Sequence, residues 1–203
     1  MKMNFKIRLL SLILGLIFFS CNKDASEPET STSLDNGLAD AYFNDMHAVV
    51  NSAAADNGFA GFVSENTENK TAASDCPIVT FSEAMGVFPN TMTIDFGVGC
   101  TGYYSIERSG KIEATFTGPY SEEGTVITIV PIDYFVNGNH LEGTKTITNM
   151  GLNADGLIHF SIHVSDGKIT FADGDEITWT ADRDREWTEG FATAEIIDDV
   201  YSI

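Results

Sequence analysis

Two hydrophobic patterns succeed each other along most of the chain. Between Leu38 and Ala55, apolar residues recur every three or four positions, and the helix-ending residues Asp56-Asn57-Gly58 follow them. This period predicts one amphipathic helix over residues 36–57. From Cys76 onward the pattern changes to short runs of β-branched and aromatic residues separated by Gly, Asn and Asp. Such runs are typical of antiparallel strands.

The strand-like runs are separated by turn residues at intervals of roughly 8–12 residues. The run at 158–164 alternates between apolar and polar positions, whereas the run at 126–132 is apolar on both faces and is expected in the centre of the sheet. Hairpin turns are predicted at Asp166-Gly167 and at Asp173-Gly174-Asp175. The predicted strands are 77–82, 91–96, 111–117, 126–132, 144–148, 158–164, 168–171, 176–187 and 200–203. The fold class is therefore mainly β, an antiparallel meander forming a sandwich or partial barrel after one N-terminal helix.

The beginning of the chain has the pattern of an export signal. Three basic residues precede an apolar run at 9–19, and Ser20 and Cys21 follow it. The run is too short to span a bilayer, which takes about 20 apolar residues. The pattern predicts a lipoprotein signal peptide over residues 1–20, with Cys21 lipidated and attached to the membrane through its lipid. An ordinary signal peptide cut at another position is the alternative.

Composition defines the remaining segments. Residues 21–35 are rich in Pro, Ser, Thr and acidic residues, which is typical of a flexible tether. The run at 200–203 predicts a strand that is either an edge strand or the beginning of further β structure. The predicted organisation is a signal peptide at 1–20, a tether at 21–35, a helix at 36–57, a linker at 58–75 and a β domain at 76–203.

The other two cysteines predict a disulfide. Cys76 and Cys100 lie on either side of a turn at Phe88-Pro89-Asn90, and an exported protein reaches an oxidising compartment. Closing such a loop stabilises the fold by roughly 3 kcal/mol. No histidine adjacent in sequence suggests a catalytic thiol.

The chain is strongly acidic, with 11 basic and 30 acidic residues and a net charge of −19 at pH 7. Removal of residues 1–20 takes away three basic residues and no acidic ones, which leaves −22. Such a protein repels the phosphate backbone, so nucleic acid is excluded as a partner. Calcium is a candidate cofactor on charge density alone, although tight turns also require Asp. The aspartates concerned are Asp166, Asp173, Asp175, Asp182 and Asp184.

The histidines do not predict a metal site. His159 and His163 share one strand face, but four residues of strand separate their Cα atoms by about 13 Å. His140 comes from a different strand, and nothing in the sequence brings it near them. We expect these histidines to face solvent rather than to bind zinc.

The aromatic residues are expected mainly in the core or at its edge. Trp179 shares strand parity with apolar neighbours and is predicted to be buried, while Trp187 shares parity with Arg183 and Arg185 on a charge-paired face. Tyr103 and Tyr104 follow a Gly-rich turn and are expected to be exposed. The sequence shows no phosphate-binding loop, nucleophile elbow or Cys-x-x-Cys pair, so no catalytic, cofactor-binding or metal-binding residue is predicted.

Five strings from Cys76 onward are distinctive: Cys76-Pro77-Ile78-Val79-Thr80, Thr93-Ile94-Asp95-Phe96-Gly97-x-Gly99-Cys100-Thr101-Gly102, Arg108-Ser109-Gly110-Lys111-Ile112, Tyr134-Phe135-Val136-Asn137-Gly138 and Leu141-Glu142-Gly143-Thr144. Together they resemble a group of uncharacterised lipoproteins of the Bacteroidota that have repetitive β-strand sequence. The likeness extends over most of residues 76–201. It implies an all-β fold and an envelope location but no activity, and such lipoproteins generally continue further, which implies that this chain is a C-terminally truncated member.

These observations predict an outer-membrane lipoprotein, displayed on the cell surface rather than facing the periplasm. The acidic residues that follow Cys21 resemble those that mark surface export in the same bacteria. We expect non-enzymatic binding or adhesion with a glycan or protein ligand. A secreted hydrolase, for example one directed at glycans with a site assembled from distant strands, is the main alternative. A structural envelope protein is the third.

Overall fold

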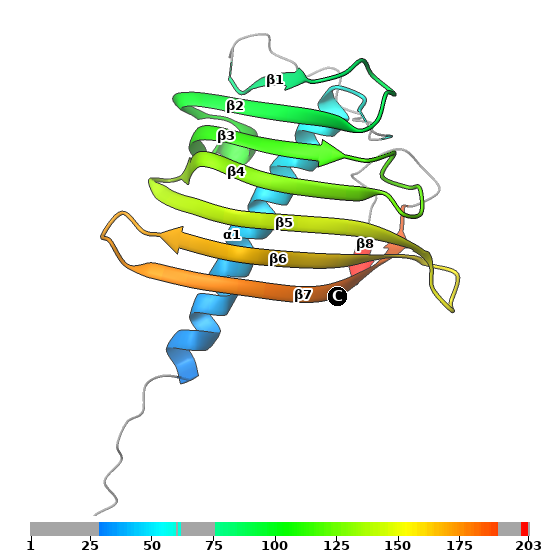
Figure 1. The fold of residues 1–203 in the computed structure, drawn as a ribbon. Helices are drawn as coiled ribbons and strands as arrows, with labels where there is room; N and C mark the ends of the chain where they lie inside the picture. Colours follow the sequence, from blue (N-terminus) through cyan, green and yellow to red (C-terminus); the bar gives the residue numbers. More distant parts are fainter. Residues whose placement is uncertain (1–28, 60, 62–75, 191–199, 203) are drawn as a thin grey trace, which may run out of the picture.

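The computed structural model describes residues 29–59, 61, 76–190 and 200–202 (Figure 1). The predicted signal peptide, Cys21, the tether as far as residue 28, most of the linker and Ile203 lie outside this part of the chain. The elements are α1 (Glu29–Asp56), β1 (Ile78–Phe81), β2 (Asn90–Thr101), a 3-10 turn (Tyr103–Ser105), β3 (Glu107–Phe116), β4 (Val126–Val136), β5 (Asn139–Leu152), β6 (Ile158–Thr170), β7 (Glu176–Glu189) and β8 (Val200–Ser202).

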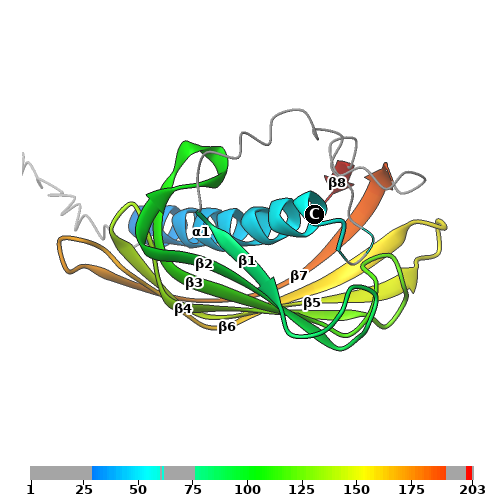
Figure 2. The ribbon, with the colours of Figure 1, turned by 90° about the horizontal axis from the view of Figure 1, so that it is seen from above.

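The eight strands form one antiparallel sheet in the order of the sequence, with β1 and β8 at its edges. The predicted mainly β meander with one N-terminal helix is therefore confirmed. Figure 2 shows that the sheet is curved like a trough and that α1 lies along its concave side. The molecule consequently resembles the predicted partial barrel and not a sandwich, because a helix takes the place of the second sheet.

The hydrophobic core lies between α1 and the concave face of the sheet. Apolar residues at the helical period, including Phe43, Met46 and Val50, have no exposed surface. They pack on alternate residues of the strands, such as Ile112 and Ile129, which are equally buried. Burial of each large apolar side chain contributes about 1.5–3 kcal/mol, so this interface fixes the helix on the sheet.

The core also includes a residue of the predicted polar linker. Phe59 is almost completely buried, and its ring centroid lies 4.7 Å from that of Phe81 and 5.1 Å from that of Phe116. It therefore extends the core past the end of α1 to the edge strand β1.

The helix begins earlier than its apolar pattern predicts. It starts at Glu29 rather than at residue 36, and residues 32–38 are exposed. Figure 1 shows this end of α1 projecting beyond the sheet. Hydrophobic period marks only the part of a helix that packs on a core, which explains why the first turns were assigned to the tether.

The predicted hairpin at Asp166-Gly167 is wrong. β6 continues through these residues and pairs with β5 and β7 on both sides of them. Asp166 has a φ of +52° at a register shift, so this is a β-bulge. The same residue types favour bulges and tight turns, because both need left-handed backbone conformations. The turn predicted at Asp173-Gly174-Asp175 does join β6 to β7, and the amide of Phe171 donates to the carbonyl of Asp175 at 2.8 Å.

The predicted disulfide is present. Cys76 and Cys100 are bonded, and their Cα atoms are 6.4 Å apart. The bond joins the residues before β1 to the far end of β2. It thereby fixes the base of the β2–β3 connection, which contains the 3-10 turn.

Candidate functional site

The three histidines that the sequence analysis considered as metal ligands are not brought together in the structure. The Nδ1 of His163 lies 2.6 Å from a carboxylate oxygen of Asp182, and the Nδ1 of His159 lies 3.0 Å from the carbonyl of Gly151. His140 is at the opposite end of the strands from His159. Within the described residues, no group of three or more His, Cys, Asp or Glu side chains is arranged to hold a metal ion.

The aspartates considered for calcium occupy three separate places. Asp166 is at the bulge of β6, whereas Asp173 and Asp175 are in the hairpin that follows, where the amide of Asp175 donates to the side chain of Asp173. Asp182 and Asp184 are exposed on β7. Turn and bulge formation therefore accounts for three of the five.

His163 and Asp182 form a His–carboxylate pair on the outer, convex face of the sheet. Thr146 lies opposite His163 in the strand register, so a hydroxyl, an imidazole and a carboxylate follow each other across three strands. The side chains of His163 and Asp182 are 51% and 85% exposed. Water screens such an exposed pair, and a nucleophile needs an enclosed site to be activated, so the pair does not favour the hydrolase alternative.

Trp179 is buried, as its strand parity predicts, whereas Trp187, expected with the two arginines on a charge-paired face, also belongs to the core. The guanidinium of Arg185 lies 4.1 Å from the ring centroid of Tyr201, while Arg183 pairs with Asp40 of α1 at 3.2 Å. These residues fasten β7 to α1 and β8, which is a structural role.

The tyrosines after β2 hold the helix. Tyr103 and Ser105 bound the 3-10 turn, and Tyr104 has a left-handed φ of +59°. The hydroxyl of Tyr104 lies 2.8 Å from that of Ser52, and the hydroxyl of Tyr103 donates to Asp56 at 3.2 Å. Burial, followed by the charge of Asp56, raises the pKa of Tyr103. Tyr104 is 60% exposed, as expected, but Tyr103 is only partly so.

A buried ion pair links α1 to β3 near the same connection. The guanidinium of Arg108 donates to Asp45 at 2.6 Å and to the carbonyl of Tyr103, also at 2.6 Å. The side chain of Arg108 has no exposed surface, whereas that of Asp45 is 20% exposed. The charge of Arg108 is thus neutralised from the concave side of the sheet.

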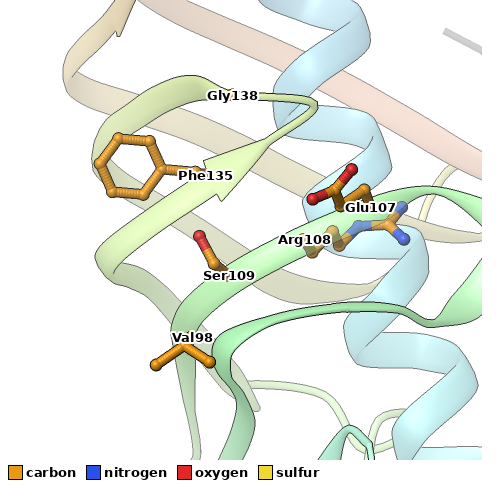
Figure 3. Close-up of a pocket in the computed structure, with 6 residues that line it drawn as sticks. All are labelled: Val98, Glu107, Arg108, Ser109, Phe135 and Gly138. Carbon is orange, nitrogen blue, oxygen red and sulfur yellow. The ribbon is translucent and has the colours of Figure 1, made fainter.

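On the other side of the same strands lies a hollow of about 270 Å³. Figure 3 shows the guanidinium of Arg108 turned away from Phe135 and toward α1. Ser109 faces Phe135 across the strand pair β3–β4. The residues that line the hollow are Val98, Glu107, Arg108, Ser109, Phe135 and Gly138 (Figure 3).

Local sequence explains how the strands build this hollow. The turn between β4 and β5 is Asn137-Gly138, with φ values of +50° and +81°, which suits a two-residue hairpin of type I′. It places Phe135 directly opposite His140 on β5. Val98 stands in the Gly-rich end of β2 and is fully exposed, so the rim of the hollow is apolar on that side.

Phe135 and His140 stack face to face next to the hollow. Their ring centroids are 4.5 Å apart and their planes differ by 21°. His140 also lies 3.7 Å from Glu142. We call Phe135 and His140 the aromatic platform. Of the two rings only Phe135 lines the hollow, so a ligand there can stack only on the face of Phe135 that His140 does not cover, beside Ser109 and Glu107.

Sequence reasoning assigned no role to any side chain of this hollow, although four of its residues stand in the strings that carry the family resemblance. In sequence Tyr134, Phe135 and Val136 are all apolar, so the pattern alone does not tell which of them faces outward. The structure buries Tyr134 and Val136. Strict alternation therefore places an aromatic ring on the outer face. Local sequence pattern does not predict the position of Val98, because that position depends on the path of the whole β2–β3 connection.

Comparisons of the chain with protein-family models, with curated proteins and with solved structures found no match. Within the described residues, no helix is long and apolar enough to cross a membrane.

Proposed function

We propose that this protein is a lipid-anchored envelope protein that binds carbohydrate without altering it chemically. The aromatic platform beside the outer hollow is the observation that supports the proposal. Aromatic rings present large, rigid apolar surfaces, on which the C–H faces of a sugar ring stack. Ser109 and Glu107 supply a hydroxyl and a carboxylate beside the ring, and a sugar hydroxyl can donate to either.

The hollow suits binding because its walls are held in place. The disulfide fixes the base of the β2–β3 connection, and the Asp45–Arg108 pair attaches the start of β3 to α1. A preorganised site loses little conformational entropy when a ligand binds. Its volume is slightly below the range of about 300–1,000 Å³ for ligand pockets, which favours one small ring over a drug-sized molecule.

The charge distribution indicates which sugars fit. Among the described residues, two charged side chains line the hollow, and of these Glu107 is exposed. Arg108 lines the hollow, but its guanidinium is committed to Asp45. A neutral sugar is therefore favoured over an anionic one.

Ligand-observed NMR on the full-length protein in detergent tests the proposal, with a panel of neutral mono- and disaccharides as probes. We expect weak binding of at least one sugar, and its loss in Phe135→Ala. Ile132→Ala is the matched control, since Ile132 is exposed on the same strand but does not line the hollow. The proposal fails if no sugar binds to the wild-type protein, or if Phe135→Ala binds as the wild type does.

A further inference from the structure

A second hollow lies over β6 and β7 at the same end of the strands. Its volume is about 430 Å³. Lys168 and Thr178, which face each other across the two strands, contribute to it together with the bulge at Asp166. The full lining is Asp166, Gly167, Lys168, Thr178, Trp179 and Thr180.

A continuous series of contacts joins the two hollows. Phe135 lines the first hollow and stacks on His140, and His140 lies 3.7 Å from Glu142. Glu142 in turn lies 3.9 Å from the ammonium of Lys168, which lines the second hollow. Phe135, His140 and Thr170 are also in direct cross-strand register, so their side chains form one row across the outer face.

We propose that the two hollows and the aromatic platform between them bind one extended, neutral glycan chain that runs across the strands. This inference rests on the proposed carbohydrate-binding function and specifies its ligand. From β3 to β7 the path crosses four strand spacings, which amounts to about 19 Å at 4.7–4.9 Å each. A span of this length takes several sugar units, whereas a single sugar would occupy only the first hollow.

The orientation of the path favours a glycan over a peptide. Extended peptides usually bind by adding a strand to an open sheet edge, where unpaired backbone groups are available. The path crosses β4, β5 and β6, whose backbone groups pair with strands on both sides. The surface therefore offers side-chain hydroxyls, carboxylates, an ammonium and aromatic rings, and these are groups that bind sugars.

The charges along the path favour a neutral chain. Glu107, Asp166 and Glu176 surround it, and Lys168 is already paired with Glu176 at 2.7 Å. Because Lys168 is paired in this way, it contributes little positive potential along the path, and the whole chain has a net charge of −19. Chains of uronic acids or sulfated sugars would be repelled.

Calorimetry with neutral gluco- and manno-oligosaccharides of one to six units tests the inference on the full-length protein in detergent. We expect affinity to rise at least tenfold from the disaccharide to the tetrasaccharide and then to level off. The variant Lys168→Ala/Thr178→Ala removes side chains of the second hollow. It should lower the affinity for the longest chain about fivefold or more and leave disaccharide binding unchanged. Thr146→Ala, on the same outer face but in neither hollow, is the matched control.

The outcomes separate this inference from the function on which it rests. Equal affinity for the disaccharide and the hexasaccharide, with binding still lost in Phe135→Ala, overturns the extended path but leaves carbohydrate binding intact. If an oligomer of uronic acids binds more tightly than a neutral chain, the inference that the ligand is neutral is overturned. Failure of every oligosaccharide to bind overturns the proposed function itself.

Discussion

Two cationic side chains, Arg108 and Lys145, are buried between the helix and the sheet. Arg108 is held by Asp45, and the ammonium of Lys145 donates to the carbonyl of Phe43 and to the side chain of Asn44. Burial lowers the pKa of Lys145 to about 7. Buried charges contribute little net stability but are costly when a partner is lost. We infer that these contacts fix one position of α1 on the sheet, because sliding the helix would leave each charge unpaired.

Asp45→Asn is expected to destabilise the fold by about 3–5 kcal/mol, because it leaves the guanidinium of Arg108 buried without a counter-charge. Asp95→Asn is the matched control. Asp95 pairs with Lys111 at 2.8 Å, but both side chains are substantially exposed, so water already screens the pair. Urea unfolding of both variants measures the difference. Equal losses would show that burial of the Arg108 pair has no energetic consequence.

His47 makes the stability depend on pH. Its side chain faces Lys145 from β5 and Arg185 from β7, and burial, followed by these two charges, lowers its pKa well below 6.5. The native state therefore keeps His47 neutral while the unfolded state takes up a proton as the pH falls through 6.5. Stability contributed in this way is present above that pH and is lost below it, by up to about 1.4 kcal/mol per pH unit.

We therefore expect His47→Gln to unfold with a weaker dependence on pH than the wild type between pH 7 and pH 5. Urea unfolding at half-unit intervals gives the two slopes. His163→Ala is the control, because His163 is exposed and should leave the slope close to that of the wild type. Parallel curves for His47→Gln and the wild type would contradict a neutral, buried His47.

At the scale of elements, local pattern identified most of the structure. Every strand of the sheet was predicted at least in part, because each has alternating or continuous apolar positions in sequence. The bulge at Asp166 was missed because a bulge and a hairpin differ only in whether the neighbouring strands stay paired, and that information lies in β5 and β7. The first turns of α1 were missed because they touch no core.

The candidate site was less accessible from sequence than the fold. The outward position of Phe135 follows from alternation only once Tyr134 and Val136 are known to be buried, and the Asn137-Gly138 turn explains why His140 lies opposite it. The two hollows depend on which strands lie side by side and on the path of the β2–β3 connection, so local pattern contains no trace of them. A sheet in sequence order nevertheless brings β4 and β5 together, as the meander predicted.

The disulfide contributes at the same scale. Its cysteines are separated by 24 positions, and closing a loop of that size stabilises the fold by about 3 kcal/mol through the unfolded state. We expect Cys76→Ala/Cys100→Ala to lose about this amount and to keep the sheet, since β1 also pairs with β2 over four residues and Phe59 packs on Phe81. Thermal unfolding and circular dichroism measure both effects. Loss of the native spectrum at room temperature would show that the bond is needed for the fold itself.

At the scale of the whole molecule, the shape bears on where a ligand binds and the charge bears on how the protein is attached to a membrane. α1 lies along the concave side of the sheet (Figure 2). Exposed or half-buried residues of the sheet, such as Phe135 and Lys168, line the two hollows. Removal of the predicted signal peptide at 1–20 would change the net charge from −19 to −22, so we expect anionic head groups to repel the processed protein. We propose that attachment to a membrane depends on lipid at Cys21 and not on electrostatic attraction.

Membrane attachment is therefore expected to be lost on mutation of Cys21 but not on washing with salt. Cys21→Ala should move the protein from the membrane fraction to the soluble fraction, whereas washing wild-type membranes with 1 M salt should release none of it, because salt screens charges but does not weaken the burial of acyl chains. Cell fractionation followed by immunoblotting measures both. Release by salt, or retention of Cys21→Ala in the membrane, would contradict lipid anchoring.

The same cells then show which way the binding face is turned. Protease added to intact cells should digest the wild-type protein while a periplasmic marker stays whole, which would place the hollows within reach of glycans outside the cell. Protection from the protease would instead restrict the ligand to glycans of the envelope. A neutral glycan chain is compatible with either location. The result therefore decides which oligosaccharides are tested first and does not bear on the inferred binding site.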